Sequence, residues 1–276
     1  MTAAAEVPPV SVDTLLRRSW TLLRTNWVIV APMLIVAIAF FVLFGGLAVL
    51  GIAYGVVSPH GTAASAGGVI ALLFLVAIVV GAGLGAVAYD ALYGMADAAW
   101  TRGTTTLGDG VAAAGARLGD TIVAMVGFVG VVIAAVILAL PTLGLVFLAL
   151  PLVTMYVFPA VVSGGFGGFA AFGESWRLVR RYFGTSAITM LILIAINYLI
   201  SMVAWVAIVP FEFMAGGSGQ GHPTLGAIAA LIVVGGIVGI VVMIASLVYT
   251  AYYAIALTGL YRWLHARALA EDAALL

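Results

Sequence analysis

Six long apolar stretches constrain the fold of this chain more than any other feature. They run over 28–50, 69–91, 121–140, 143–163, 186–210 and 225–250. About 20 consecutive apolar residues in a helix cross the hydrocarbon core of a bilayer. Only 7% of the 276 residues are charged, so the chain also lacks the surface of a soluble protein. We therefore expect an all-α integral membrane protein with six transmembrane helices in one membrane domain, 11–265.

Turn-forming residues and prolines divide the middle of the chain. The segment 141–144 (PTLG) separates the third and fourth stretches and predicts a tight hairpin between them. Pro151 predicts a kink in the fourth stretch, and Pro159 predicts its bend or its end.

All ten basic side chains are arginines, and they occupy alternate connections between the stretches. They precede the first stretch, lie between the second and third and between the fourth and fifth, and follow the sixth. The intervening connections contain none. Short loops rich in basic residues stay on the cytoplasmic side of a membrane. We expect a multi-pass protein of the inner (cytoplasmic) membrane with both termini cytoplasmic.

Two arginine-bearing segments match each other in sequence. The segments 12–26 (VDTLLRRSWTLLRTN) and 174–183 (ESWRLVRRYF) share Ser, Trp, Leu and Arg at one constant offset, with Ser19 matching Ser175. Their apolar residues recur at helical spacing, which predicts interfacial amphipathic helices. Farther along, Ala88-Tyr89 matches Ala251-Tyr252. Aromatic and basic residues also recur at membrane interfaces without any duplication.

A weaker third segment, 107–118, precedes the third stretch. We predict three cytoplasmic interfacial helices and a parallel internal repeat, with units of about 11–100, 104–165 and 170–265. Each unit contains one interfacial helix and two spans. A flexible N-terminus (1–10) and a C-terminal tail (266–276) flank them.

The run 159–180 (PAVVSGGFGGFAAFGESWRLVR) resembles the signature before the fifth span in a family of bacterial and archaeal six-span proteins. The family includes YciC-like proteins and the membrane domain fused to some glycerophosphodiester phosphodiesterases. The segment 96–119 is similar to that family's second cytoplasmic connection. Many relatives carry a glutamate shortly after the proline, where this chain has Ser163-Gly164-Gly165. The resemblance implies a six-span fold without an established activity, and the spans leave no room for a catalytic barrel.

Three polar residues within or near the stretches are candidates for a proton, ion or solute path. Asp90 and Asp97 are seven residues apart and share a helix face. Ion pairing of Asp90 with an arginine is the structural alternative, with Arg17, Arg24, Arg177 or Arg180 as partner. Asn197 lies within the fifth stretch, where hydrogen bonding between helices is the alternative to a ligand role.

No motif for catalysis, metal binding or a cofactor stands out, and the chain contains no cysteine. A net charge of zero disfavours a nucleic-acid partner. We expect a non-enzymatic scaffold or lipid-binding protein whose partners are membrane lipids, other membrane proteins or a second copy of the chain. The residues expected to face headgroups or a partner are Trp20, Arg24, Trp176, Arg177, Arg180 and Arg181. The alternative is a transporter or channel for a small solute or lipid, with Asp90, Asp97 and Asn197 along its path.

Overall fold

The computed structural model describes residues 11–57, 63–216 and 225–275, so the predicted flexible N-terminus lies outside the described residues. The described part is helical and contains no strand. Its elements are α1 (Val12–Thr25), the 3-10 helix η1 (Trp27–Val30), α2 (Ala31–Val57), α3 (Ala63–Arg102), α4 (Leu107–Ala139), α5 (Val146–Thr154), α6 (Val157–Val162), α7 (Gly168–Arg181), α8 (Phe183–Gly216) and α9 (Leu225–Ala273). The expected all-α fold is confirmed. Among the described helices, α2, α3, α4, α8 and α9 are long and apolar enough to cross a membrane.

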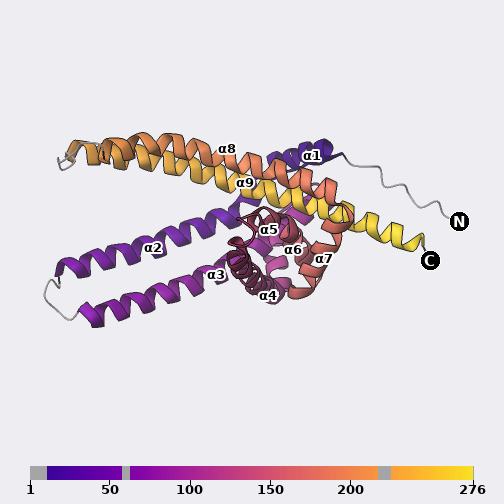
Figure 1. The fold of residues 1–276 in the computed structure, drawn as a ribbon, viewed down its shortest axis with the longest axis horizontal. Helices are drawn as coiled ribbons and strands as arrows, with labels where there is room; N and C mark the ends of the chain where they lie inside the picture. Colours follow the sequence, from indigo (N-terminus) through magenta and orange to yellow (C-terminus); the bar gives the residue numbers. More distant parts are fainter. Residues whose placement is uncertain (1–10, 58–62, 217–224, 276) are drawn as a thin grey trace.

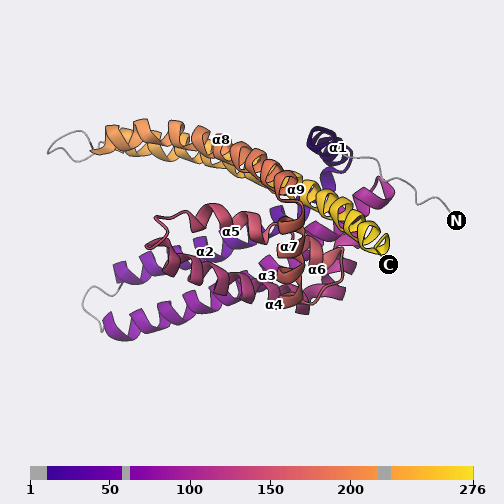
Figure 2. The same cartoon turned by 45° about the vertical axis from the view of Figure 1, so that its right-hand side comes forward.

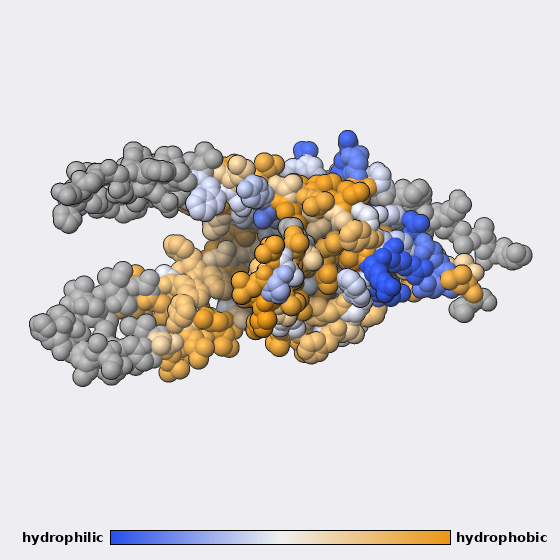
Figure 3. Space-filling view, in the orientation of Figure 1, coloured by the Kyte–Doolittle hydropathy of each residue, from blue (hydrophilic) through white to orange (hydrophobic). Residues whose placement is uncertain are grey.

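Two long helix pairs diverge from a shared helical body (Figure 1). The α2–α3 pair and the α8–α9 pair remain apart in the turned view as well (Figure 2). An apolar cleft of about 620 Å³ lies between α2 and α9, and it is lined by Ala37, Ile38, Phe41, Gly236, Gly239, Ile240 and Met243. Hydrophilic residues gather at the other end of the molecule, where α1 and the last turns of α9 lie (Figure 3).

The helical body is held together by close contacts between small and large residues. On α3 and α4, a side chain at Gly94 would overlap Ala113, so the two helices approach closely there. On α9, a side chain at Gly259 would overlap the ring of Trp100. The indole Nε1 of Trp100 donates to the carbonyl of Ile255 over 2.7 Å. These contacts fix α3 against both α4 and α9.

The fourth apolar stretch is not one continuous helix, in contrast to the predicted span over 143–163. It forms α5 and α6, each shorter than the length that crosses a bilayer, with an interruption at Met155 and Tyr156. Pro159 explains the interruption, since it has no N–H for the carbonyl of Met155 and its ring crowds that carbonyl. Pro151, in contrast, lies inside α5. The predicted turn at 141–144 is present, and Gly144 adopts a φ of 81° there.

A serine from α7 satisfies backbone groups at this interruption. The Ser175 hydroxyl donates to the Val153 carbonyl over 2.6 Å and accepts from the Tyr156 N–H over 3.2 Å. A continuous helix would pair these groups within itself. Unpaired backbone groups are costly in an apolar interior, so Ser175 stabilises the interruption.

The predicted third interfacial helix is not a separate element. Residues 107–118 form the first turns of α4, which continues without a break to Ala139. Thr106 and Asp109 cap this helix reciprocally: the Thr106 hydroxyl accepts from the Asp109 N–H, and the Asp109 carboxylate accepts from the Thr106 N–H. The predicted middle unit therefore lacks the change of direction that follows α1 and α7.

Residues 266–276 were expected as a C-terminal tail, but α9 continues through this segment to Ala273. Ala268 is buried, and Arg267 pairs with Glu271 one turn later over 2.8 Å. The end of α9 is thus part of the helical body.

Matching positions of α1 and α7 have similar surroundings. Trp20 is 46% exposed and Trp176 is 51% exposed. Both helices end at a residue outside the helical region, Asn26 (φ −130°, ψ 54°) and Tyr182 (φ −122°, ψ 44°). A long apolar helical segment follows each helix. The similarity agrees with related first and third units, and the internal repeat itself stays a prediction.

Candidate functional site

Helix α1 lies against α9 and places an aromatic side chain beside the α8–α9 pair. Ser11 caps its first turn, where the Ser11 hydroxyl accepts from the Thr14 N–H over 3.2 Å. One face of α1 buries Leu15, Ser19, Leu22 and Leu23. Trp20 lies at the edge of that face, with its ring edge-on to Tyr252 at a centroid distance of 6.2 Å.

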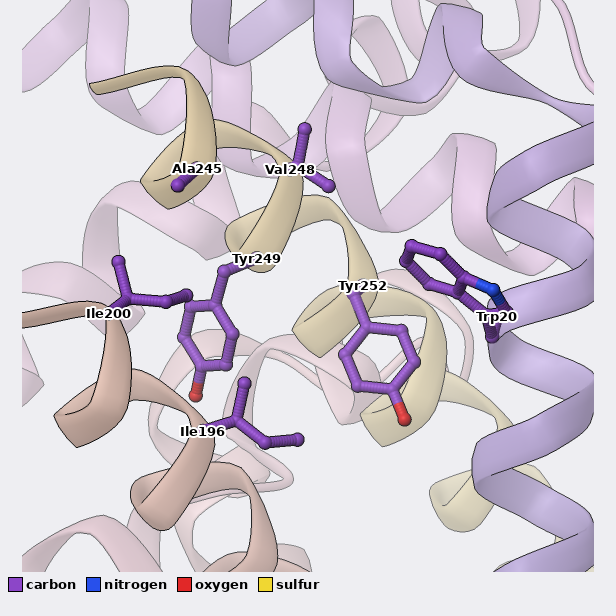
Figure 4. Close-up of a pocket in the computed structure, with 7 residues that line it drawn as sticks. All are labelled: Trp20, Ile196, Ile200, Ala245, Val248, Tyr249 and Tyr252. Carbon is purple, nitrogen blue, oxygen red and sulfur yellow. The ribbon is translucent and has the colours of Figure 1, made fainter. Parts of the chain in front are cut away.

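A groove with a volume of about 480 Å³ opens where α1, α8 and α9 meet (Figure 4). Its lining residues come from all three helices: Trp20 from α1, Ile196 and Ile200 from α8, and Ala245, Val248, Tyr249 and Tyr252 from α9. Apart from Trp20, the side chains are aliphatic or tyrosine. We call this site the α1–α8–α9 groove.

The tyrosine hydroxyls of the groove donate hydrogen bonds to backbone carbonyls. The Tyr249 hydroxyl donates to the carbonyl of Leu193 over 2.9 Å, and the Tyr252 hydroxyl donates to the carbonyl of Leu16 over 3.4 Å. The rings therefore form part of the groove wall while their hydroxyls tie α9 to α8 and α1. Such walls suit an apolar chain better than a polar solute.

Positive charge lies beside the groove. Arg24 follows Trp20 by one turn of α1, is exposed, and pairs with no carboxylate within the described part of the chain. Arg17 pairs with Asp13 over 2.9 Å, and the guanidinium of Arg18 lies 4.8 Å from the ring centroid of Trp100. Arg24 is thus available to an anion outside the protein.

The predicted headgroup-facing residues of α7 divide into two kinds. Trp176 and Arg180 are exposed. Arg177 pairs with Glu174 over 2.8 Å, and Arg181 pairs with Asp272 over 2.7 Å. Arg177 also lies 3.6 Å from Asp272, so both arginines hold α7 against the end of α9 and their charges are compensated within the chain.

Glu174 links these two helices because it also contacts His265 of α9, with 2.8 Å between its Oε1 and Nδ1 of His265. Burial raises the pKa of Glu174, but the hydrogen bonds from Arg177 and His265 outweigh that effect. The pKa of Glu174 therefore lies below its ordinary value of 4.5. The link is favoured when Glu174 is ionised.

Glu174→Gln is expected to reduce the pH dependence of stability. Because the folded pKa lies below the unfolded value, Glu174 contributes stability above about pH 4.5 and loses it as the pH falls through the lower folded pKa. Thermal unfolding in detergent, followed from neutral pH to about pH 3, measures the effect. Asp13→Asn is the control, since its exposed ion pair contributes little. A variant Glu174→Gln with the wild-type pH dependence would contradict this role.

The three predicted path residues lie in separate environments. Asp90 is fully buried on α3, where the Thr121 hydroxyl donates to Oδ1, and Oδ2 has no partner within the described part of the chain. Asp97 pairs with Arg262 over 2.6 Å. Asn197 is exposed on α8. The structure does not bring the three residues together.

The expected ion pair between Asp90 and an arginine of α1 or α7 was wrong. Asp90 accepts a hydrogen bond from the Thr121 hydroxyl of α4, whereas Arg17 pairs with Asp13 and Arg177 pairs with Glu174. A buried carboxyl with one unpaired oxygen is unusual, and it distinguishes Asp90 from Asp97.

Sequence reasoning identified Trp20 but missed the groove beside it. The sequence pattern placed Tyr252 in a repeated Ala-Tyr pair and predicted no binding role for Ile196, Ile200 or Tyr249. The available signal was the group Tyr249, Tyr252 and Tyr253, which share a helix face at a position suited to the membrane interface.

Among the described residues, no group of three or more acidic or histidine side chains could hold a metal ion. Comparison of the chain with family models, curated proteins and solved structures gave no match. The resemblance to the six-span family therefore stays a prediction.

Proposed function

We propose that this chain is a non-enzymatic integral membrane protein that binds an anionic phospholipid. One acyl chain of the lipid occupies the α1–α8–α9 groove, and Arg24 contacts the headgroup. The apolar groove beside the exposed Trp20 is the observation that carries the proposal. Bound in this way, the lipid joins α1 to the α8–α9 pair, and the protein acts as a lipid-organising scaffold.

The proposal includes a six-span arrangement in the inner membrane with both termini in the cytoplasm. Arg117 lies in the first half of α4, and the last turns of α7 carry Arg177, Arg180 and Arg181, which favours the same side of the membrane for both segments. If α4 crosses outward, α5 and α6 together return the chain to the arginine-rich side. An interrupted helix is tolerated within a membrane when protein groups pair with its free backbone atoms. The hydrogen bonds of Ser175 to Val153 and Tyr156 meet this requirement.

A lipid ligand explains the site better than a solute path through the bundle. A solute path would require Asp90, Asp97 and Asn197 to line one passage. Instead, Asp97 is ion-paired and Asn197 is exposed on the outside of α8. Only Asp90 favours the transporter alternative, through its unpaired buried oxygen.

Filling the groove tests the proposal. We expect Ala245→Phe to reduce copurified phospholipid about tenfold, since losing two buried methylenes of a lipid costs about 1.6 kcal/mol. Native mass spectrometry of the purified protein measures bound lipid. The control is Ala195→Phe, which adds the same bulk at an exposed position of α8 outside the groove. Equal lipid retention by the two variants would contradict the proposed site.

The headgroup contact is tested separately with Arg24→Gln. Near an anionic surface one arginine contributes about 1 kcal/mol, so we expect the purified variant to bind phosphatidylglycerol about fivefold more weakly in native mass spectrometry. Binding to phosphatidylcholine should change little. An equal loss for both lipids would exclude a charge-specific role of Arg24.

A further inference from the structure

A polar stripe crosses the otherwise apolar outer face of α8. Ile194, Asn197, Tyr198, Ser201 and Trp205 share this face because their spacing of three and four residues follows the helical turn. Tyr198 and Trp205 are each 64% exposed. Pale, less hydrophobic atoms interrupt the orange surface over the α8–α9 pair (Figure 3). We call these five residues the α8 stripe.

Asn197 lies deep in the span. It follows Phe183, the first residue of α8, by 14 positions, which corresponds to about 21 Å along the helix axis. Its side chain is exposed, and its carboxamide makes no hydrogen bond within the described part of the chain. The Ser201 hydroxyl donates to the backbone carbonyl of Asn197 over 3.0 Å and leaves the side-chain carboxamide without a partner there. Lipid tails offer no partner to a carboxamide, so this placement is unfavourable in a lone chain.

The surface beside Asn197 permits close approach of another helix. Tyr198, Ser201, Met202 and Trp205 line a shallow groove of about 290 Å³. Ser201 is the smallest of these four residues, and small residues let helix backbones meet closely in membranes. The aromatic side chains on either side provide contact area.

We infer that the α8 stripe binds the same stripe of a second copy of this chain. A carboxamide carries both donors and an acceptor, so two Asn197 side chains can each donate to the other across a two-fold axis. Both copies insert into the membrane in the same orientation, which brings Asn197 to the same depth in each. This self-complementarity favours a second copy over a lipid, which has no such donor and acceptor pair at this depth.

Cysteine cross-linking tests the inference, and the absence of native cysteines makes every introduced thiol unique. Residues beside a two-fold axis meet their own copies. We expect Ser201→Cys in phosphatidylglycerol–phosphatidylcholine vesicles, at low protein density, to form a disulfide-linked dimer on mild oxidation. Leu199→Cys is the matched control, exposed on another face of α8, and it should remain monomeric.

Adding Asn197→Leu to Ser201→Cys should reduce cross-linking about fivefold or more, in line with the strength of polar contacts between membrane helices. Asn197→Gln should restore part of it because it keeps the amide. An unchanged unfolding temperature for Asn197→Leu shows that the fold is intact. The inference is overturned if Ser201→Cys stays monomeric, if Leu199→Cys cross-links equally, or if Asn197→Leu has no effect. None of these outcomes depends on lipid binding at the α1–α8–α9 groove.

Discussion

Ser175→Ala is expected to lower the unfolding temperature of the protein in detergent and in lipid. The substitution removes the only side-chain partner that the described residues give to the Val153 carbonyl and the Tyr156 N–H. Each buried group left unpaired costs about 1–3 kcal/mol, so the total loss should be about 2 kcal/mol or more. Thermal unfolding followed by circular dichroism measures the change.

Ser19→Ala is the matched control for this prediction. Ser19 is fully buried like Ser175 and occupies the corresponding position of α1, but its hydroxyl donates only to the Leu15 carbonyl of its own helix. Loss of that bond should cost much less, because the Leu15 carbonyl is also positioned to accept within the helix. Equal destabilisation by the two substitutions would show that Ser175 does not stabilise the interruption between α5 and α6.

Gly259→Ala is expected to have the second large effect on stability. A methyl group at this position of α9 would overlap the ring of Trp100 and force it to move. Movement of the ring would break its hydrogen bond to the Ile255 carbonyl and separate it from Arg18. Overpacking costs about 1–3 kcal/mol and the hydrogen bond about 1 kcal/mol, so we expect a loss of about 2–4 kcal/mol.

Gly235→Ala provides the control on the same helix. Within the described part of the chain, no heavy atom beyond the local helix backbone lies within 4 Å of a methyl group at Gly235. Alanine is also the better helix former, so this variant should match or slightly exceed the wild-type unfolding temperature. Tryptophan fluorescence of Gly259→Ala should shift as Trp100 becomes more exposed. An unchanged emission spectrum together with unchanged stability would contradict close packing at this position.

The features that could be predicted from the sequence are those set by local pattern. Apolar runs of about 20 residues marked α2, α3, α4, α8 and α9, because length and hydropathy alone make a helix able to span lipid. The spacing of Leu15, Leu22 and Leu23 defined α1 and left Trp20 at its surface. The segment 141–144 formed the expected turn.

The features that could not be predicted depend on contacts between distant segments. Pro159 predicted a bend, but no local sequence feature indicated that the Ser175 hydroxyl would hydrogen-bond the backbone groups left free at the interruption. The α1–α8–α9 groove requires Trp20 to meet Tyr252 across more than two hundred residues, and periodicity does not report that contact. For Asp90, abundant arginines suggested an ion pair, whereas packing of α3 on α4 gave it Thr121 instead.

The interruption between α5 and α6 has a consequence for the order of biogenesis. Ser175 is translated 22 residues after Val153 and 19 residues after Tyr156. Until α7 has been synthesised and packs on this interruption, the described part of the chain offers these two backbone groups no other side-chain partner. A chain that ends before α7 would therefore leave two backbone groups unpaired in an apolar segment. We expect α5, α6 and α7 to fold as one unit, because the interruption has its side-chain hydrogen bonds only once Ser175 is in place.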